Sequence, residues 1–166
     1  MTDAALALPP LTAETPTDTA EVDGLILRAF GPGRFVKAAE RLREGRAPIA
    51  SLSFVARAGG EVVGCVRQWR VTVGGGPAIL LGPFAVDPEW RSQGLGAALI
   101  ERACAAATSA GERLIVLVGD APYFGPLGFA VAPRLTLPGP VDPRRVFLKG
   151  LVAGAADGVQ GPVVPA

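Results

Sequence analysis

The chain has 166 residues, a formal net charge of +1 and 49% apolar residues. This length and composition predict one domain with a single packed core, and the small net charge argues against nucleic acid or an acidic membrane as a partner. The sequence contains no histidine, which excludes Ser-His-Asp and Cys-His hydrolysis and every metal site that needs a histidine ligand.

Two cysteines, Cys65 and Cys104, are too few for a disulfide framework, so a reducing compartment is expected. No apolar run reaches the length of about 18 residues that a membrane span needs. The N-terminus carries an acid and no base before its short apolar run, which is a poor match to a signal peptide. These features predict a cytoplasmic protein with no membrane partner.

The first third of the chain predicts a flexible start followed by helices. Residues 1–16 are rich in Pro, Thr and Ala, with a short strand expected near 11–15. Asp18 and Glu21 resemble a capping box at the start of a helix that ends before the Gly-Pro-Gly of residues 31–33. A second helix is predicted over 34–44, where arginines at 41, 43 and 46 alternate with Glu40 and Glu44, a pattern typical of a solvated face.

The middle and end of the chain predict a sheet with one crossover. Strands are expected over 49–57, 62–73, 78–86, 113–119 and 144–152, a helix over 94–110 and a short helical segment within 120–129. Pro83 interrupts the third strand and predicts a bulge or an end of pairing, because proline cannot donate to the ladder. Residues 153–166 are expected to form a loose tail. The order predicts a mixed α/β (α+β) fold, in which a mostly antiparallel twisted sheet contains one parallel pair and has helices on both faces. Residues 17–152 are expected to form one domain.

The stretch "WRSQGLGAAL" (90–99) carries the clearest functional signal. It brings Arg91, Gly94 and Gly96 to a strand-to-helix junction, where unpaired N–H groups and the helix dipole favour an anion. The residues do not match a P-loop. They match the dinucleotide-binding fingerprint only in part, because its third glycine is missing here. A pyrophosphate is the expected ligand. A dinucleotide-binding protein remains an alternative, as does a junction with no ligand.

The pattern R-x-x-G-x-G after "FAVDPEW" resembles the GCN5-related N-acetyltransferase (GNAT) superfamily. "SFVA" (53–56), "LGPFAVDPEWRSQGLGAALI" (81–100) and "YFGPLGF" (123–129) are similar to its YhbS-like branch in particular. The resemblance covers residues 18 to 152 and implies a domain that binds acetyl-CoA as cosubstrate without a metal.

The resemblance implies roles for single residues. Backbone N–H groups of residues 93–97, with Arg91, would hold the pyrophosphate, and the strand end at 84–86 would hold the pantetheine arm. Since Pro83 has no N–H, Phe84 or Ala85 would donate to the developing oxyanion. Tyr123 would protonate the leaving thiolate. The full set of implied cofactor-binding residues is Phe84, Ala85, Val86, Arg91, Ser92, Gln93, Gly94, Leu95, Gly96, Ala97 and Phe124.

Other polar and aromatic side chains receive weaker assignments. Asp120 would either orient a substrate amine, relay its proton, or cap the following turn. The resemblance implies an acceptor pocket near Phe35, Ser53 and Arg67. The two cysteines are expected in the core, since no histidine is present to activate them. The tryptophans at positions 69 and 90 are expected at the surface or in an interface.

The sequence therefore predicts an N-acetyltransferase that moves an acetyl group directly from acetyl-CoA to a primary amine of a small molecule or peptide, within a ternary complex. The alternatives are a non-catalytic CoA-binding or regulatory module with the same fold, or a dinucleotide-binding protein. The acceptor is not identified by the sequence, and a homodimer remains open.

Overall fold

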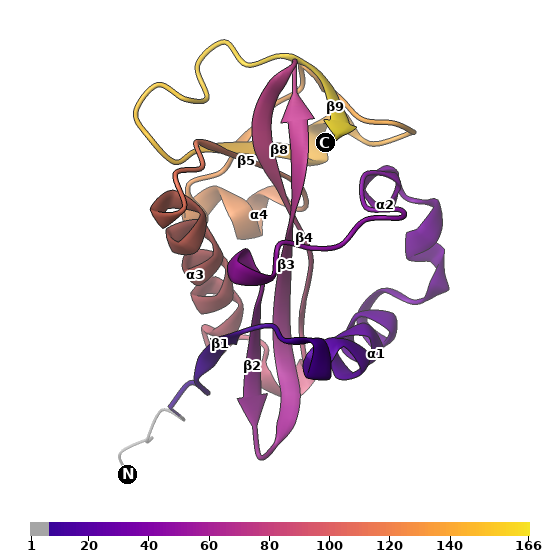
Figure 1. Ribbon diagram of the computed structural model, residues 1–166, viewed down its shortest axis with the longest axis vertical. Coiled ribbons are helices and arrows are strands. Elements are labelled where there is room, and N and C mark those ends of the chain that lie inside the picture. The colour runs from indigo at the N-terminus through magenta and orange to yellow at the C-terminus, as the bar shows by residue number, and fades with distance from the viewer. Residues whose placement is uncertain (1–6) are drawn as a thin grey trace.

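The computed structural model describes residues 7–166, without the side chains of residues 35 and 36, and shows one sheet between helices (Figure 1). Residues 1–6 of the flexible start expected over 1–16, and the side chain of Phe35, lie outside this description. The strands are β1 (Leu11–Ala13), β2 (Phe54–Ala58), β3 (Glu61–Val73), β4 (Gly76–Val86), β5 (Leu114–Val118), β6 (Ala130–Val131), β7 (Leu135–Thr136), β8 (Val146–Gly150) and β9 (Gly161–Pro165). The helices are α1 (Thr19–Phe30), α2 (Ala38–Arg41), α3 (Leu95–Ser109) and α4 (Ala121–Phe124).

The sheet order is β1-β2-β3-β4-β5-β8-β6, and β4 and β5 form the expected parallel pair within mostly antiparallel neighbours. Strand β9 corrects the prediction of a loose tail. It runs antiparallel to the end of β3 and parallel to β7, and Val163 is only 1% exposed. The burial of this valine on the sheet explains why a segment flanked by Gly and Pro is ordered.

The two long helices cover opposite faces of the sheet (Figure 1). Alternate residues of the strands point to opposite faces, so Val66 packs in the cluster that holds α3, whereas Cys65 packs in the cluster that holds α1. Gly64 allows α3 to approach closely, because a Cβ there would lie 2.8 Å from Leu99 Cδ1. The position of α3 against the sheet is therefore set by packing along its whole length.

The start of α1 and the segment after it differ from the prediction. Asp18 does precede the first helical residue, but its carboxylate accepts the Thr15 N–H (2.8 Å) and an Arg57 N–H (2.6 Å) rather than an amide of α1. The Arg57 hydrogen bond lowers the pKa of Asp18. The helix predicted over 34–44 is instead a 3₁₀ turn (Pro32–Val36) and the short α2, because Lys37 is extended (φ −75°, ψ 146°) between them.

The interruption predicted at Pro83 is confirmed as a bulge between β3 and β4. Val66 pairs with Phe84 and Gln68 pairs with Leu81, so two residues of β4 face the single residue Arg67. The sheet bends at this point, and the parallel pairing of β4 with β5 ends just before it, at Leu80.

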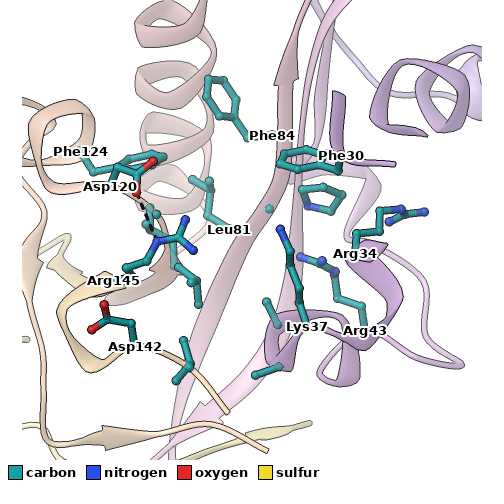
Figure 2. Close-up of a pocket in the computed structure, with 18 of the residues that line it drawn as sticks. Phe30, Arg34, Lys37, Arg43, Leu81, Phe84, Asp120, Phe124, Asp142 and Arg145 are labelled. Atoms are coloured by element: carbon teal, nitrogen blue, oxygen red, sulfur yellow. Dashed lines mark hydrogen bonds and ion pairs between the residues drawn. The ribbon is translucent and has the colours of Figure 1, made fainter. Parts of the chain in front are cut away.

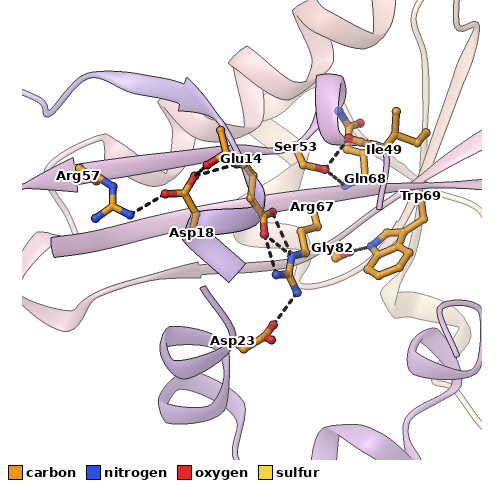
Figure 3. Close-up of polar contacts among 11 residues, drawn as sticks. Glu14, Asp18, Asp23, Ile49, Ser53, Arg57, Arg67, Gln68, Trp69 and Gly82 are labelled. Carbon is orange, nitrogen blue, oxygen red and sulfur yellow. Dashed lines mark hydrogen bonds and ion pairs between the residues drawn. The ribbon is translucent and has the colours of Figure 1, made fainter. Parts of the chain in front are cut away.

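Buried polar contacts fix the β3 side of the bulge (Figure 3). The Gln68 backbone N–H donates to Ser53 Oγ (3.1 Å), and its side-chain amide donates to two carbonyl oxygens, of Leu52 (2.7 Å) and Ala103 (3.0 Å). The Trp69 indole N–H donates to the Gly82 carbonyl (2.5 Å). Trp69 is 7% exposed, so its predicted surface position is wrong.

Arg67, at the centre of the bulge, joins three elements through its guanidinium (Figure 3). Its Nη2 lies 2.7 Å from Glu14 Oε1, and its Nη1 lies 2.9 Å from Asp23 Oδ1 on α1. Arg67 and Glu14 are each 8% exposed. The predicted role of Arg67 in an acceptor pocket is therefore wrong, because its donors are occupied within the protein.

This pairing makes the bulge sensitive to the loss of either charge. Arg67→Met should lower the free energy of unfolding by about 3–5 kcal/mol, because it leaves the Glu14 carboxylate buried without a partner. Urea unfolding followed by tryptophan fluorescence measures the change. The double variant Glu14→Leu/Arg67→Met should recover a large part of the loss, and a single variant within about 1 kcal/mol of the wild type would contradict this view of the pair.

Candidate active site

An interstrand cavity of about 560 Å³ opens where β4 and β5 separate beyond the bulge (Figure 2). Its floor is apolar and includes Leu81, Phe84 and Phe124. Cations from the segments just before and just after α2 (Arg34, Lys37 and Arg43) line one wall, and carboxylates of Asp120 and Asp142 line the other. A hollow of this size is large enough for a small-molecule ligand.

A second hollow, the loop cavity of about 420 Å³, lies between the end of β4 and the start of α3. Nine of the twelve site residues expected from the sequence line it: Phe84, Ala85, Val86, Arg91, Ser92, Gly94, Gly96, Ala97 and Tyr123. Phe124 lines the interstrand cavity instead. Gln93 and Leu95 line neither, since the Gln93 side-chain amide donates to the Glu89 carbonyl (2.7 Å) and Leu95 is fully buried in the core.

The N-terminus of α3 supplies donors to the loop cavity. Gly94 has a left-handed backbone (φ 87°), and the Ala98 N–H donates to the Gly94 carbonyl at 3.0 Å. The N–H groups of residues 95–97 therefore have no acceptor within the helix. Arg91 Nε donates to the Val86 carbonyl (3.1 Å), which holds the guanidinium across the strand end. Together they form a cationic site suited to an anion.

The ladder register decides which amides of β4 face the opening. The Asp87 N–H donates to the Val63 carbonyl on β3 (2.8 Å), and hydrogen-bonded pairs alternate along an antiparallel ladder. Ala85 is therefore directed toward β3, whereas Phe84 and Val86 are directed away from it. Of the two expected oxyanion donors, Phe84 has the suitable direction and Ala85 does not.

Tyr123, in α4, stands where the two cavities meet. Its ring centroid lies 5.8 Å from that of Phe84 and 4.9 Å from that of Phe124, and the side chain is 40% exposed. Partial burial raises the pKa of the phenol, so the hydroxyl stays protonated at neutral pH. Tyr123, Phe84 and Phe30 each line both cavities, so the two hollows are neighbours that share these three side chains.

The hydroxyl of Tyr123 lies directly over Gly96. A Cβ at Gly96 would overlap this hydroxyl and would stand 3.0 Å from the Phe84 ring. Gly96 thus has a second reason to be glycine beyond access of an anion to the backbone: it makes room for the tyrosine.

Several other expected residues lie elsewhere. Ser53 is fully buried and donates to the Ile49 carbonyl (2.9 Å), so its predicted place in an acceptor pocket is wrong. Asp120 does not cap α4 through its side chain, which instead pairs with Arg145 (3.2 Å). Trp90 is half-buried against the core rather than at the surface.

Both cysteines are buried, as predicted. Burial raises the pKa of the Cys65 thiol to about 12 and also raises that of Cys104. Neither thiol is available as a nucleophile at neutral pH.

The sequence reasoning missed the cationic wall of the interstrand cavity. Lys37 and Arg43 line it, and Arg43 is not part of a solvated face, because its side chain is 10% exposed. The alternation of charges in this segment predicted an exposed face. The 3₁₀ turn and the short α2 instead bring these residues to β4.

Residues 50–131 match the family described as acetyltransferase (GNAT) domain. The uncharacterized N-acetyltransferase YhbS of Escherichia coli is 30% identical over 125 residues, which cover 74% of this chain and 74% of that protein. The chain belongs to the GNAT family. This membership confirms the resemblance seen in the sequence.

Solved structures of GNAT proteins share the fold. The crystal structure of YhbS from Escherichia coli in complex with CoA has a TM-score of 0.82 at 28% identity and covers 100% of this chain and 93% of that one. A GNAT family acetyltransferase from Brucella melitensis in complex with acetyl-CoA has a TM-score of 0.70 at 26% identity, with 95% of each chain covered. The predicted α/β class is confirmed by these relatives.

Within residues 7–166, no cluster of three or more His, Cys, Asp or Glu side chains is placed to hold a metal ion. The helices of the same residues include none long and apolar enough to cross a membrane.

The contact between Gly96 and Tyr123 can be tested by a double-mutant cycle. Gly96→Ala should destabilise the wild type by about 1 kcal/mol more than it destabilises Tyr123→Phe, because removal of the hydroxyl relieves the overlap. Chemical denaturation of the four proteins gives the coupling energy. Equal costs of Gly96→Ala in both backgrounds would show that the hydroxyl does not lie over this glycine.

Proposed function

We propose that this GNAT protein is an acetyl-CoA-dependent N-acetyltransferase that acetylates a primary amine by direct transfer in a ternary complex. The observation that carries the proposal is that the two cavities are neighbours that share Phe84 and Tyr123. A hollow suited to an anion thus lies beside a second hollow that has room for an acceptor. The complexes of YhbS with CoA and of the Brucella melitensis protein with acetyl-CoA support the same assignment of the loop cavity.

The residues of the loop cavity fit the chemistry of acetyl-CoA. Arg91 and the free N–H groups at the start of α3 would bind the pyrophosphate, and the outward-facing backbone of residues 84–86 would bind the pantetheine arm. Acetyl-CoA supplies an acetyl group activated as a thioester. The remaining chemistry falls to the protein: it must hold the acceptor, stabilise negative charge on the carbonyl oxygen and provide a proton.

Two groups of this chain have suitable positions for that chemistry. The Phe84 N–H is directed toward the opening and would donate to the developing oxyanion. The amine nitrogen forms a bond to the acetyl carbon, the C–S bond breaks, and the Tyr123 hydroxyl would donate its proton to the sulfur. Tyr123 suits this role because a phenol is protonated at neutral pH, and partial burial raises its pKa further.

The burial of both cysteines supports direct transfer of the acetyl group from acetyl-CoA to the amine. Both are buried with raised pKa values, so an acetyl-enzyme on either thiol is not expected. Initial-rate plots with varied acetyl-CoA and amine should therefore intersect. The alternative of a non-catalytic CoA-binding module is disfavoured by the open interstrand cavity, which bulky side chains do not fill.

Ligand-induced stabilisation tests the cofactor site. Acetyl-CoA at about 100 times its Kd should stabilise the protein by about 2.7 kcal/mol, whereas pantetheine without phosphates and NAD should give much smaller shifts in Tm. Arg91→Ala should weaken acetyl-CoA binding about tenfold, through loss of a charge-assisted contact. Arg102→Ala, on an exposed part of α3, is the matched control. A larger shift with NAD than with acetyl-CoA would overturn the proposal.

Tyr123→Phe tests the proton donor. The variant keeps the aromatic ring, so the Kd of acetyl-CoA should stay within about twofold while kcat falls by roughly 10²–10⁴-fold. The phenol pKa is raised from its ordinary value, so wild-type kcat should not fall from loss of this proton until the pH exceeds about 10. Calorimetry and steady-state assays of CoA release separate the two effects. Unchanged kcat with a confirmed acceptor would assign Tyr123 a structural role only.

A further inference from the structure

The wall of the interstrand cavity formed by α2 and the turn before it is cationic. From the charges on this wall and on the opposite wall, we propose that the acceptor is a short primary amine that also carries a carboxylate or phosphate group. The anion is held by Arg43 and Lys37, and the amine is directed toward the end of β5. This inference names the substrate class of the proposed acetyltransferase and rests on that function.

Arg43 is the residue that reaches furthest into the sheet opening. Its Nη1 would lie 3.4 Å from a Cβ at Gly82, within the bulge of β4, and the side chain is 10% exposed. Among the described residues its hydrogen-bond partner is Glu40 alone (Nη2 to Oε2, 2.8 Å), and its buried Nε has no partner. A guanidinium this deeply placed has donors left for a bidentate anion.

The side chains of this wall carry more positive than negative charge. The Glu40 carboxylate is shared between Arg43 and Arg34 (3.3 Å). Lys37 is exposed, its Nζ lies 5.8 Å from the centroid of the Phe30 ring, and it has no ion pair within the described chain. Burial is the main cause of a lowered pKa at Arg43, to which the nearby Arg34 and Arg67 add. An anionic ligand would compensate a positive charge that the protein leaves in excess.

The opposite wall has the complementary chemistry (Figure 2). The carboxylates of Asp120 and Asp142 line it, beside Arg145. The hydrogen bond that Asp142 accepts from Arg144 lowers the pKa of this carboxyl below its ordinary value. The cavity thus offers a cationic end and an end with two carboxylates, each paired with one arginine and able to accept a further hydrogen bond from an amine, which matches a ligand with an anion at one end and an amine at the other.

The distance between the two ends limits the ligand's length. Arg43 meets β4 at Gly82, and the Phe84 N–H, where the acetyl group would lie, is two residues further along. A regular strand advances about 3.3 Å per residue and the bulge shortens that advance, so the anion and the amine would be at most roughly 7 Å apart. About three to five carbons span this distance, and the apolar side chains of Leu81 and Phe84 would contact them. Polycationic amines are disfavoured by the same cations that favour an anion.

Two matched sets of amines test the inference on the full-length protein with acetyl-CoA. The first set is 4-aminobutyrate, its amide and n-butylamine; the second is O-phosphoethanolamine and ethanolamine. Rates of CoA release give kcat/KM, and calorimetry gives the binding of each amine. In at least one set, the amine that carries the carboxylate or phosphate should have a kcat/KM about tenfold or more above that of the amine without an anionic group, called the neutral amine below. The set that responds distinguishes a carboxylate from a phosphate.

Charge variants assign the effect to this wall. Lys37→Gln, at an exposed position, should lower kcat/KM for the anionic amine about tenfold and leave the neutral amine within about twofold. Arg43→Lys should give a similar loss, because it keeps the charge beside Glu40 but removes the planar fork. Arg28→Gln, on an exposed part of α1 outside the cavity, is the control and should change neither amine.

The outcomes separate this inference from the proposed function. Equal or better use of the neutral amines, or a preference for anionic amines that Lys37→Gln leaves unchanged, overturns the inference and leaves the acetyltransferase intact. Binding and turnover of no amine in either set, with the acetyl-CoA shift in Tm retained, also overturns it. Loss of that shift in the wild type counts against the proposed function instead.

Discussion

The candidate active site depends on the bulge at Gly82 and Pro83, where β4 turns away from β5. This one irregularity opens the sheet, directs the Phe84 N–H into the opening and exposes Gly82 to Arg43. An irregular strand needs support from elsewhere in the fold. Arg67 provides it from the opposite strand by joining β3 to Glu14 and to α1, and the Trp69 indole holds the Gly82 carbonyl. Stability and function therefore converge on the same few residues.

The cofactor end is built on a different principle, the orientation of one helix. Packing of α3 residues such as Leu95 and Leu99 in the core fixes its N-terminus beside the end of β4. The loop itself contributes the left-handed backbone of Gly94 and the side chain of Arg91, which donates to the end of β4. A rigid helix end offers amides that are already oriented, so binding an anion there costs little further ordering of the chain.

Much of this arrangement could be predicted from the sequence, because its signals are local. Apolar alternation predicted the central strands, Pro83 predicted the bulge, and the spacing of Arg91, Gly94 and Gly96 predicted the anion site. The errors arise where long-range contacts decide. The family resemblance implied an acceptor-pocket role for Arg67, and the ion pair with Glu14 that rules it out joins residues 53 positions apart. The burial of Arg43 and the pairing of β9 with β3 likewise depend on contacts that periodicity within one segment does not contain.

The aromatic side chains of Phe84 and Tyr123 belong to both cavities, and this shared wall couples whatever binds on its two sides. A ligand that fixes either ring from the loop cavity alters the surface offered to a ligand in the interstrand cavity. Thermodynamic linkage then requires reciprocity: the factor by which the first ligand changes the affinity of the second equals the factor by which the second changes the affinity of the first. Two ligands that contact these rings from the two sides would therefore be linked, and the affinity of each would have to be stated together with the occupancy of the other side.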